Sequence, residues 1–476
     1  MRVKITALCV MVLFMIKSNA QQESGGTLSL RQSIETGIAN NLQVRLRDLD
    51  MQRANVNYRQ SKGNMIPTLS ANVLHGINQG RSINPFTNAY INQQLNIANY
   101  SISSDVTIFN GFRLLNSLKQ TSLAYDASKM ELEQARYELT LDIILAYLQI
   151  LNNEDQLVQS RNQAALSRKQ VERLEVLNKD GAIAPALLYE IRGQLANDEL
   201  AIVNTQNALN VSKVTLAQLM NVPLDPNIQV ERLNAEQFSM TYEGDAATIY
   251  QAAIRELAAV KAVDLRKQSA EKGVKVAKGA LAPTVYFGAD LSTNYSSAGR
   301  RELILNSFND TTKSFVTVNG NSFSVITPRN NVAEEKIGYM DQIKNNYGTF
   351  LGIGIRIPIL NSLRARNQVS LAKIDLKSAE YTAQTTYIQL KQAIDQAFLN
   401  MKTAEERYRI LTAQVEAFNA AFRAAEVRFN AGLGTSVDYQ IARNNLDRAN
   451  INLVNARYDY VLRTKILDYY QNKPLW

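Results

Sequence analysis

Met65-Ile66-Pro67-Thr68-Leu69-Ser70 is the stretch that decides the fold, because its Pro-Thr pair occurs a second time in the chain. The second occurrence is Leu281-Ala282-Pro283-Thr284-Val285-Tyr286, at an offset of 216 residues. In both copies a helical pattern precedes the pair and an alternating, strand-like pattern follows it. The pair therefore marks the same point in two copies of one structural unit.

A second group of matches has an offset of 251 residues. The matched positions are Asn110 and Asn361, Arg113 and Arg364, Leu139 and Leu390, Ala146 and Ala397, Gly181 and Gly432, and Arg192 and Arg443. The two offsets differ by 35, so the second copy carries about 35 extra residues between its strands. We predict a tandem duplication of a unit that runs from helix to strand to strand to a long helical hairpin.

The first twenty residues resemble a secretory signal peptide, with Arg2 and Lys4 before a short apolar core and Ser18-Asn19-Ala20 as a cleavage site. The only cysteine, Cys9, lies inside this segment, so the exported chain needs no disulfide. Removing the segment lowers the formal net charge from +9 to +6. Such a mild and scattered charge does not point to a nucleic-acid partner.

Beyond the signal segment, no stretch approaches the ~18 apolar residues that a membrane-spanning helix requires. Any membrane crossing must therefore use strands. The alternating segments have two different faces: Tyr100, Ile102, Val106 and Ile108 oppose Ser101, Ser103, Asp105 and Thr107, and Leu351, Ile353, Ile355 and Ile357 oppose Gly348, Gly352, Gly354 and Arg356. One apolar and one polar face is typical of a barrel strand between lipid and a wet lumen, although a soluble sandwich has the same alternation.

The segments between paired strands are polar. Residues 79–99 are rich in Asn and Gln, and residues 296–346 contain Asn319-Gly320, a hairpin turn signal, between alternating segments. The second segment holds the 35-residue excess. We expect it to be a long loop at the cell surface.

Two proline- and glycine-free segments, 113–180 and 361–431, can form rods of roughly 100 Å. Heptad stripes accompany them: Val415, Phe418, Phe422, Ala425 and Phe429 face Leu446, Ala449, Leu453, Ala456 and Tyr460, and Leu195, Ile202 and Leu209 form a weaker stripe in the first copy. Glycine-containing turns at 180–185 and 431–435 separate the helices. Each copy is thus predicted to end in an antiparallel helical hairpin.

These patterns divide the chain into a signal peptide (1–20), a first repeat (21–221), a joining segment (222–245) expected as a belt at mid-tunnel, a second repeat (246–471) and a C-terminal tail (472–476). The first repeat has a helix at 28–64, a strand pair at about 66–110 and a helical hairpin at 113–221. The second repeat has a helix at 246–281, a strand pair at about 283–359 that includes the surface loop 296–346, and a helical hairpin at 361–471.

Four barrel strands cannot close a barrel alone, because closure takes about eight strands and open edges are not tolerated in lipid. The chain must therefore oligomerise. The doubled strand pairs, the Pro-Thr starts, the strand exits Phe109-Asn110-Gly111 and Leu360-Asn361-Ser362, and the hairpin glycines resemble the TolC family of outer-membrane efflux and secretion ducts.

The resemblance implies a mixed α and β membrane protein in the outer membrane of a Gram-negative bacterium. A homotrimer would form a twelve-stranded barrel, four strands per chain, continuous with a long periplasmic α-helical barrel. It also implies a periplasmic adaptor as partner and an inner-membrane pump of the RND or ABC class, so that drugs, metals or peptides leave through a passive duct or a type I secretion system.

The residues offer no catalytic site. The chain has no Gly-rich phosphate loop, no cluster of metal ligands and a single histidine, His75, in an alternating strand. We predict no enzyme activity and no cofactor, and a structural or lumen-facing role for His75.

The resemblance also assigns an aperture at the periplasmic end. Asp438 matches an acidic aperture residue of the family, and three copies would make a negative ring. Where a second acid is common, this chain has Ile441, and the first repeat has Leu187 at the place of Asp438. Thr435 and Asp438 also fit a capping box, which by itself would explain the acid. The hairpin tips, Gly181, Ala182, Gly432, Leu433, Gly434 and Thr435, are expected to dock the adaptor.

Two other classes remain open from the residues alone. A periplasmic adaptor also has long helical hairpins, but it would carry one hairpin and not two strand pairs with an apolar face. A structural coiled-coil protein of the envelope would explain the heptads but not the alternating strands.

Overall fold

The computed structural model describes residues 27–83, 88–92, 94–226, 228–232, 242 and 244–475. The chain forms two compact units, and the division between them falls inside four helices: α2 (Leu42–Gly63), α3 (Arg113–Lys179), α6 (Ala258–Gly279) and α8 (Arg364–Asn430). Unit 1 comprises 1–55, 123–267 and 378–476, and unit 2 comprises 56–122 and 268–377. The expected signal peptide, 1–20, lies outside the described residues.

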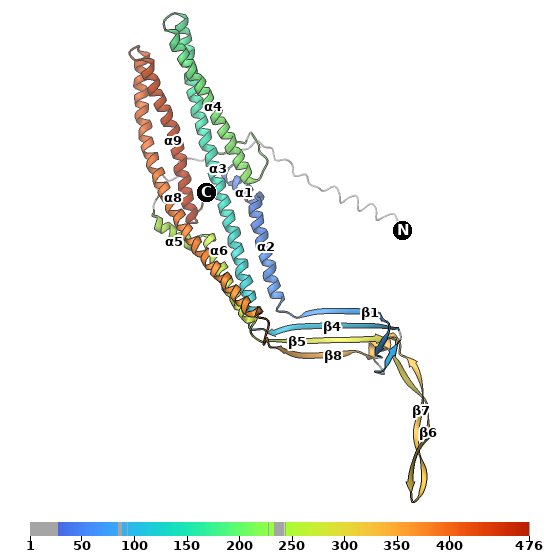
Figure 1. Cartoon of the computed structure of the whole chain (residues 1–476). Helices are drawn as coiled ribbons and strands as arrows, with labels where there is room; N and C mark the ends of the chain where they lie inside the picture. Colours follow the sequence, from blue (N-terminus) through green and yellow to red (C-terminus); the bar gives the residue numbers. More distant parts are fainter. Residues whose placement is uncertain are drawn as a thin grey trace, which may run out of the picture. The chain divides into compact units, whose positions relative to one another are not determined.

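Unit 2 is built on a four-stranded antiparallel sheet with strand order β1-β4-β5-β8 (Figure 1). The strands are β1 (Thr68–Asn78), β4 (Leu95–Phe109), β5 (Thr284–Ser296) and β8 (Gly348–Arg356). The outer strands β1 and β8 pair on one side only within the chain. Both strands of the first repeat thus join both strands of the second in one ladder.

The strand registers confirm that the sheet has one apolar face. Residues directly opposite each other in a sheet share a face. Val73 lies opposite Tyr100, Ile102 opposite Leu291, and Val106 opposite Phe287. Further along the same face Phe287 lies opposite Ile353, and the face carries Leu69, Leu351 and Ile355 as well, all exposed in the single chain. The other face is mainly polar and carries Thr68, Ser70, Asn72, Asp105, Asp290 and Arg356, together with Leu74, Tyr286 and Phe350.

His75 lies on the apolar face, because it is opposite Ala98, two residues from the Val73 and Tyr100 pair. Of the two roles expected for His75, structural or lumen-facing, this position does not fit the lumen-facing one and leaves the structural one as a prediction. On the polar face, Gly354 makes room for an aromatic ring: a Cβ at Gly354 would lie 2.3 Å from Cζ of Tyr286. Gly352 likewise leaves room for the Phe350 ring, whereas a Cβ at Gly348 would have no neighbour within 4 Å among the described residues.

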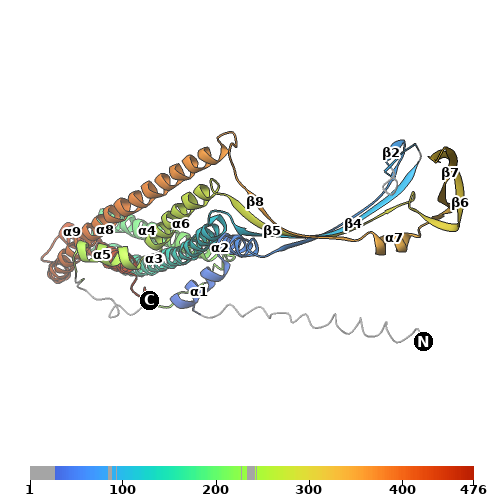
Figure 2. The same cartoon turned by 90° about the horizontal axis from the view of Figure 1, so that it is seen from below.

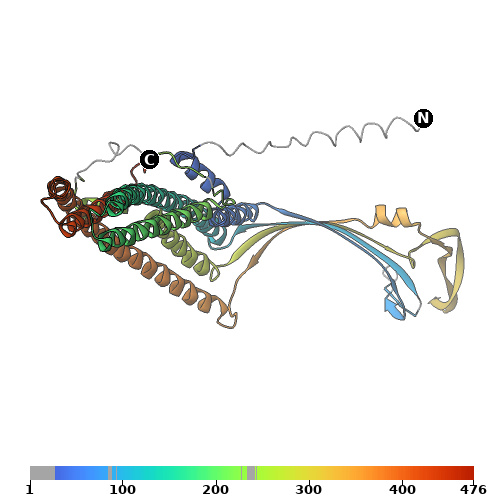
Figure 3. The same cartoon turned by 90° about the horizontal axis from the view of Figure 1, so that it is seen from above.

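The segment 296–346, expected as a loop, is mostly regular structure. It forms a hairpin of β6 (Arg300–Val318) and β7 (Asn321–Lys336), followed by the short helix α7 (Tyr339–Asn345). Asn319 and Gly320, both with positive φ, make the turn of this hairpin. Figures 2 and 3 show the hairpin, which we call the arm (300–336), beyond the end of the four-stranded sheet. A smaller hairpin, β2 (Arg81–Ile83) and β3 (Tyr90–Asn92), lies between β1 and β4 in sequence.

Each expected helix before a strand pair is two helices. The helix predicted at 28–64 is α1 (Leu30–Asn40) and α2 (Leu42–Gly63), and the helix predicted at 246–281 is α5 (Ala246–Glu256) and α6 (Ala258–Gly279). The breaks, Asn41 and Leu257, are 216 residues apart and both have extended backbones. Asn41 stabilises its break because its amide donates to the carbonyl of Leu219 and its Oδ1 caps α2.

Four long helices make the two hairpins: α3 (Arg113–Lys179) with α4 (Pro185–Met220), and α8 (Arg364–Asn430) with α9 (Ser436–Tyr470). The heptad stripe of α8 is half-buried along its length, and Ala449, Ala456 and Tyr460 of α9 are buried. In unit 1, the main core gathers Ile143, Tyr147, Ile150, Ile249, Ile394 and Leu467. Within the described residues, no helix combines the length and the apolar character that crossing a membrane requires.

The joining segment 222–245 lies only partly within the described residues. Leu28 pairs with Val230 in a parallel bridge, and the Tyr147 hydroxyl donates to the carbonyl oxygens of Leu28 and Glu231. This part of the segment is therefore packed against α3. The expected belt role of the segment remains a prediction.

The turns from strand to long helix are the same in both repeats. Gly111 and Phe112 have φ of 65° and 60°, and Ser362 and Leu363 have φ of 54° and 62°. In the first repeat the turn contacts the end of α6 so closely that a Cβ at Gly111 would lie 2.7 Å from the carbonyl oxygen of Gly279. Because neither Gly111 nor Gly279 has a side chain, the backbone of the turn and the backbone at the end of α6 can come into contact.

Candidate aperture and docking site

The two helical hairpins end in turns of one construction. The Ala182 amide donates to the Leu177 carbonyl at 2.8 Å, and the Leu433 amide donates to the Arg428 carbonyl at 2.9 Å. Gly181 and Gly432 occupy the left-handed position with φ of 71° and 74°. This is the Schellman arrangement, and every member of it is shifted by 251 residues between the repeats.

The two turns lie at the same end of unit 1 (Figure 1). Near this end Arg173 of α3 donates to Asn430 of α8 at 2.7 Å, which ties the hairpins together. Gly181, Ala182, Gly432 and Thr435 are exposed, and Leu433 is 76% exposed. Only Gly434 is half-buried, because it packs against the end of α8. The residues expected to dock an adaptor thus form one exposed surface, the docking tips.

Asp438 lies in the first turn of α9, and the capping box expected there is half-formed. The Thr435 hydroxyl accepts from the Asp438 amide at 3.1 Å. Within the described part of the chain, the Thr435 amide donates no hydrogen bond to the Asp438 carboxylate. The cap therefore uses the backbone of Asp438, and the carboxylate is exposed and available for another role.

Ile441 is exposed on the same face of α9 as Asp438, one turn further along. Tyr439, between them, points the other way: it is buried and packs against the rings of Phe422 and Phe429, with centroids 5.5 and 5.1 Å apart. The buried ring fixes the orientation of the first turns of α9. Asp438 and Ile441 are thereby presented together on its exposed side.

A buried charged cluster lies behind this face, and sequence reasoning missed it. Arg443 is only 2% exposed and donates to the Gln163 carbonyl of α3 at 2.8 Å. Its guanidinium lies 3.5 Å from Asp198 of α4 and 3.5 Å from Asp447 of α9. Ser167 donates a further hydrogen bond to Asp198. The cluster joins the two hairpins in their interior.

The cluster contains one guanidinium, Arg443, and two carboxyl groups, Asp198 and Asp447. Burial raises the pKa of the Asp447 carboxyl, and the nearby Arg443 charge only partly offsets it. The Nη1 atom of Arg443 is buried and has no hydrogen-bond partner among the described residues. The only signal in the sequence was that Arg443 repeats Arg192. That match misleads, because Arg192 is half-exposed and pairs with Glu175.

A second polar cluster lies further along α3. Asp155 accepts from Arg232 and Arg457, each at 2.7 Å, and from the Tyr458 hydroxyl at 2.8 Å. Burial and the hydrogen bond to the Asp155 carboxylate raise the pKa of Tyr458 to about 12. Asp155 thus connects the joining segment, α3 and α9.

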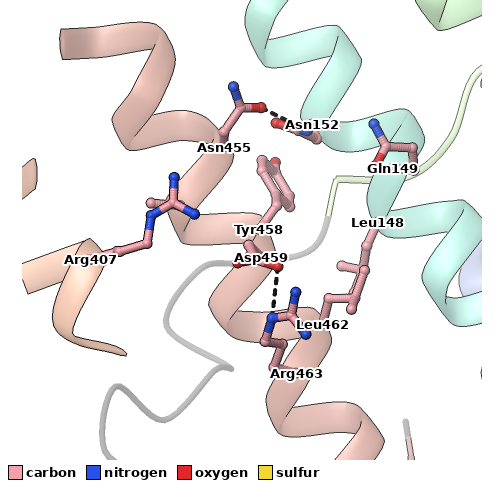
Figure 4. Close-up of a pocket in the computed structure, with 10 residues that line it drawn as sticks. Leu148, Gln149, Asn152, Arg407, Asn455, Tyr458, Asp459, Leu462 and Arg463 are labelled. Carbon is pink, nitrogen blue, oxygen red and sulfur yellow. Dashed lines mark hydrogen bonds and ion pairs between the residues drawn. The ribbon is translucent and has the colours of Figure 1, made fainter. Parts of the chain in front are cut away.

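A pocket of about 360 Å³ lies beside this cluster, between α3, α8 and α9 (Figure 4). Asn152 donates to Asn455 across its upper edge, and Asp459 pairs with Arg463 at 3.0 Å. Gln149, Arg407 and Leu462 complete much of its lining. Within the described residues no group of three or more His, Cys, Asp or Glu side chains could hold a metal ion. The pocket brings amides and a neutralised ion pair together, which is not a set of groups for acid–base chemistry.

An open four-stranded sheet with one apolar face, together with two long helical hairpins, defines a class: subunits of ducts that cross a membrane on strands. The sequence pattern of the family described as outer membrane efflux protein matches residues 34–222 and 249–467. The chain belongs to this family. The two matched segments correspond to the two repeats.

Individual relatives agree with this family. The outer membrane protein TolC of Escherichia coli (strain K12) is 20% identical over 392 residues, which are 76% of this chain and 71% of TolC. VceC of Vibrio cholerae superposes with a TM-score of 0.74 and 15% identity, covering 94% of this chain and 97% of VceC. The CmeC channel of Campylobacter jejuni gives 0.73 and 15%, covering 95% of this chain and 90% of CmeC. At these identities the structural likeness shows the fold.

Family membership makes the chain an outer-membrane exit duct of an efflux system and not an enzyme. The periplasmic adaptor and the structural coiled-coil protein are therefore set aside. The strands belong to the outer-membrane part of the fold and the long helices to the periplasmic tunnel.

Proposed function

We propose that three copies of the chain close a twelve-stranded barrel, in which β8 of each copy pairs with β1 of the next. The observation that carries this proposal is the open ladder β1-β4-β5-β8 with its apolar face. Unpaired strand edges are not tolerated in lipid, and the strands of one copy are too few to curl into a closed barrel. Pairing between copies removes both edges at once.

The internal duplication supports a particular register for this pairing. The β1 and β4 register matches the β5 and β8 register under the two offsets, since Thr68 opposite Asp105 becomes Thr284 opposite Arg356. The same two offsets, applied to the β4 and β5 register inside the chain, give the register expected between β8 of one copy and β1 of the next. Val73 of one copy then lies opposite Ile355 of the next, and both belong to the apolar face.

Cysteine pairs test the closure and the register together. The expected signal segment contains the only cysteine, so introduced cysteines have no competitor after its removal. Val73→Cys with Ile355→Cys and Asn72→Cys with Arg356→Cys occupy two consecutive pairs, one of which has the closer, non-hydrogen-bonded spacing. We expect disulfide-linked trimers from at least one of them.

The control for this test is Val73→Cys with Leu351→Cys, which is displaced by four residues, about 13 Å along the strand. It should give little cross-linking. Light scattering in mild detergent, corrected for bound detergent, should give a mass near three chains. A detergent-free monomer, or cross-linking by the displaced pair alone, would contradict the proposed closure.

In this assembly the four long helices of each copy line a periplasmic tunnel, and the docking tips meet a periplasmic adaptor linked to an inner-membrane pump of the RND or ABC class. The exposed Leu433 at the tip supports this role. Leu433→Asp should abolish adaptor-dependent efflux and leave the trimer intact. Leu200→Asp, at an exposed position of α4 away from the tips, is the matched control and should transport normally.

Three copies of Asp438 would form a negative ring at the tunnel aperture, with Ile441 as an apolar ring behind it. The exposed carboxylate supports this assignment, because the helix cap does not use it. Asp438→Asn keeps the capped backbone and removes the charge. We expect the cation preference to fall, measured as the reversal potential across a planar bilayer.

Thr435→Val is the control for the aperture test, because it removes the cap and keeps the charge. It should cost about 1 kcal/mol of helix stability and leave ion selectivity unchanged. An unchanged reversal potential in Asp438→Asn would reject the aperture assignment. The role of Asp438 would then be limited to the start of helix α9.

A further inference from the structure

The arm is a long hairpin with no core of its own. Its strands contain 19 and 16 residues, and almost every side chain along them is exposed. A two-stranded hairpin alone in water is marginally stable at best. The arm therefore needs a covering surface.

Each face of the arm carries large apolar side chains among its polar ones. The register places Ile304, Phe315, Ile326 and Val332 on one face, and Leu303, Phe308, Val316 and Phe323 on the other. These eight side chains are 41% to 63% exposed. A partner on one side would cover only half of them.

The edges of the arm are poorly suited to pairing with further strands. Pro328 in β7 has no amide proton to donate. On the β6 edge the register is irregular between Thr311 and Phe315, where Lys313 lies. Such features prevent extension of a sheet at its edge. Contacts of the arm must therefore be made by its faces.

The root of the arm is held firmly. Gln342 of α7 is buried, accepts from the Ser296 amide at 2.9 Å and donates to the carbonyl oxygens of Ser296 and Ile337 at 3.0 Å each. The Tyr339 ring packs against Tyr295 with centroids 4.5 Å apart. The direction in which the arm leaves the sheet is thus fixed by specific contacts.

We propose that the arms of the three copies pack face to face beyond the outer mouth of the duct. This inference rests on the proposed trimer. A threefold arrangement gives every arm a neighbour on each side, which matches large apolar side chains on both faces and blunted edges. Five basic and four acidic residues in 300–336 nearly balance, so the arms do not repel one another.

Lipid is not the covering surface. The paired part of β5 and β8 contains nine residues, about the length that a tilted strand needs to cross a membrane. The arm begins only after these strands and contains charged residues on both faces, such as Arg300 and Arg301. The arm therefore extends past the membrane.

Spin labels near the tip test the packing. Ser322→Cys, labelled and reconstituted with the full chain in nanodiscs, reports the distances between the three arms. Packed faces lie about 10 Å apart, so a single distance below roughly 30 Å is expected. A broad distribution or a longer distance in an intact trimer would overturn the proposal.

Phe315→Ser with Phe323→Ser and Ile326→Ser removes apolar cover from both faces. We expect the short-distance fraction at Ser322→Cys to fall at least about tenfold, because each buried aromatic or aliphatic side chain contributes over 1 kcal/mol. Asn309→Ser with Thr311→Ser and Thr317→Ser is the matched polar control and should keep the distance. An unchanged fraction in the apolar variant would also overturn the proposal.

The test separates this inference from the trimer on which it rests. Cross-linking of Val73→Cys with Ile355→Cys reports the barrel independently of the arm. A cross-linked barrel with separated arms rejects the arm contact alone. Absence of both signals rejects the trimer together with the arm contact.

Discussion

Single residues matter most where charge is buried, and Arg443 is the clearest case. It joins α9 to α3 and α4 in the interior of unit 1. Its equivalent in the first repeat, Arg192, pairs with Glu175, and both of these side chains are half-exposed. Arginine at these two equivalent positions therefore contributes differently to stability, because solvent screens the ion pair of Arg192 and not that of Arg443.

Arg443→Met should lower the free energy of unfolding by about 3 kcal/mol, because it leaves Asp198 buried without its charged partner. The remaining donors to Asp198, Ser167 and Gln194, keep the loss at the low end. Arg192→Met should cost under about 1 kcal/mol. Denaturant midpoints of the two variants, followed by circular dichroism, give the comparison. Equal midpoints would show that the buried cluster carries no special weight.

The raised pKa of Asp447 predicts how the stability of the folded chain changes with pH. Its pKa is raised in the folded chain, so the folded state binds a proton more tightly than the unfolded state. The cost of holding the carboxylate is present above the folded pKa and disappears as pH falls through it. We expect the wild-type chain to gain stability relative to Asp447→Asn as pH is lowered from 7.5 toward 4.

Thermal midpoints at a constant scan rate over this pH range provide the measurement for Asp447. The comparison with Asp447→Asn cancels the contributions of all other acids. A difference that stays constant with pH, or changes in the opposite direction, would mean that Asp447 does not titrate in the cluster.

At the scale of elements, the duplication predicted the order of helices and strands well because turn chemistry is local. Pro67 and Pro283, Gly181 and Gly432, and the heptad stripes of α8 and α9 each depend on a few neighbours in sequence. The break at Asn41 was not predictable in this way, since no proline or glycine marks it. It is stabilised by a hydrogen bond to Leu219, which is 178 positions away.

The same reason explains the missed site. Arg443, Asp198 and Gln163 come from three helices, and no spacing in the sequence brings them together. The arm was half-predicted: Asn319-Gly320 marked a hairpin, but the length of the segment suggested a loop. The aperture and docking residues, which came from the family resemblance, remain predictions.

The ends of α2 and α6 offer a test at this scale. A Cβ at Gly279 would lie 2.8 Å from the Gly111 carbonyl oxygen and 3.1 Å from the Arg113 Cβ. Gly279→Ala should therefore cost about 1 to 3 kcal/mol through overpacking. Gly63 is its equivalent in the first repeat, and its Cβ would meet only the flexible end of Gln60 at 3.9 Å.

Gly63→Ala should be neutral or stabilising by up to about 1 kcal/mol, because alanine favours the helix. Thermal midpoints of Gly63→Ala and Gly279→Ala check the contrast. A loss of stability in both variants would indicate that Gly63 also faces a close neighbour in the assembled protein.

At the scale of the whole molecule, the two faces of the sheet decide whether the duct can insert. Val73 is at the middle of β1 on the apolar face, and Asn72 beside it is on the polar face. Val73→Arg should cost about 2 to 4 kcal/mol per copy in the membrane. Asn72→Arg faces the lumen and should insert normally.

The amount of folded protein in outer-membrane fractions, measured by heat-modifiable migration, distinguishes these two variants. The cost of Val73→Arg is counted three times in a trimer, so the yield should fall steeply. Similar yields from both arginine variants would contradict the assignment of the faces.

The turn at Ser362 has a mechanical consequence for the assembled ring. It has the conformation of the turn at Gly111, but Ser362 carries a side chain where Gly111 has none. In the proposed trimer, we therefore expect the turn at Gly111 to pack more closely inside each chain than the turn at Ser362 packs against the neighbouring copy. Around a ring of three copies, tight contacts inside the chains would alternate with looser contacts between the chains. A force that opens the ring should therefore deform the three contacts between chains and not all six contacts equally.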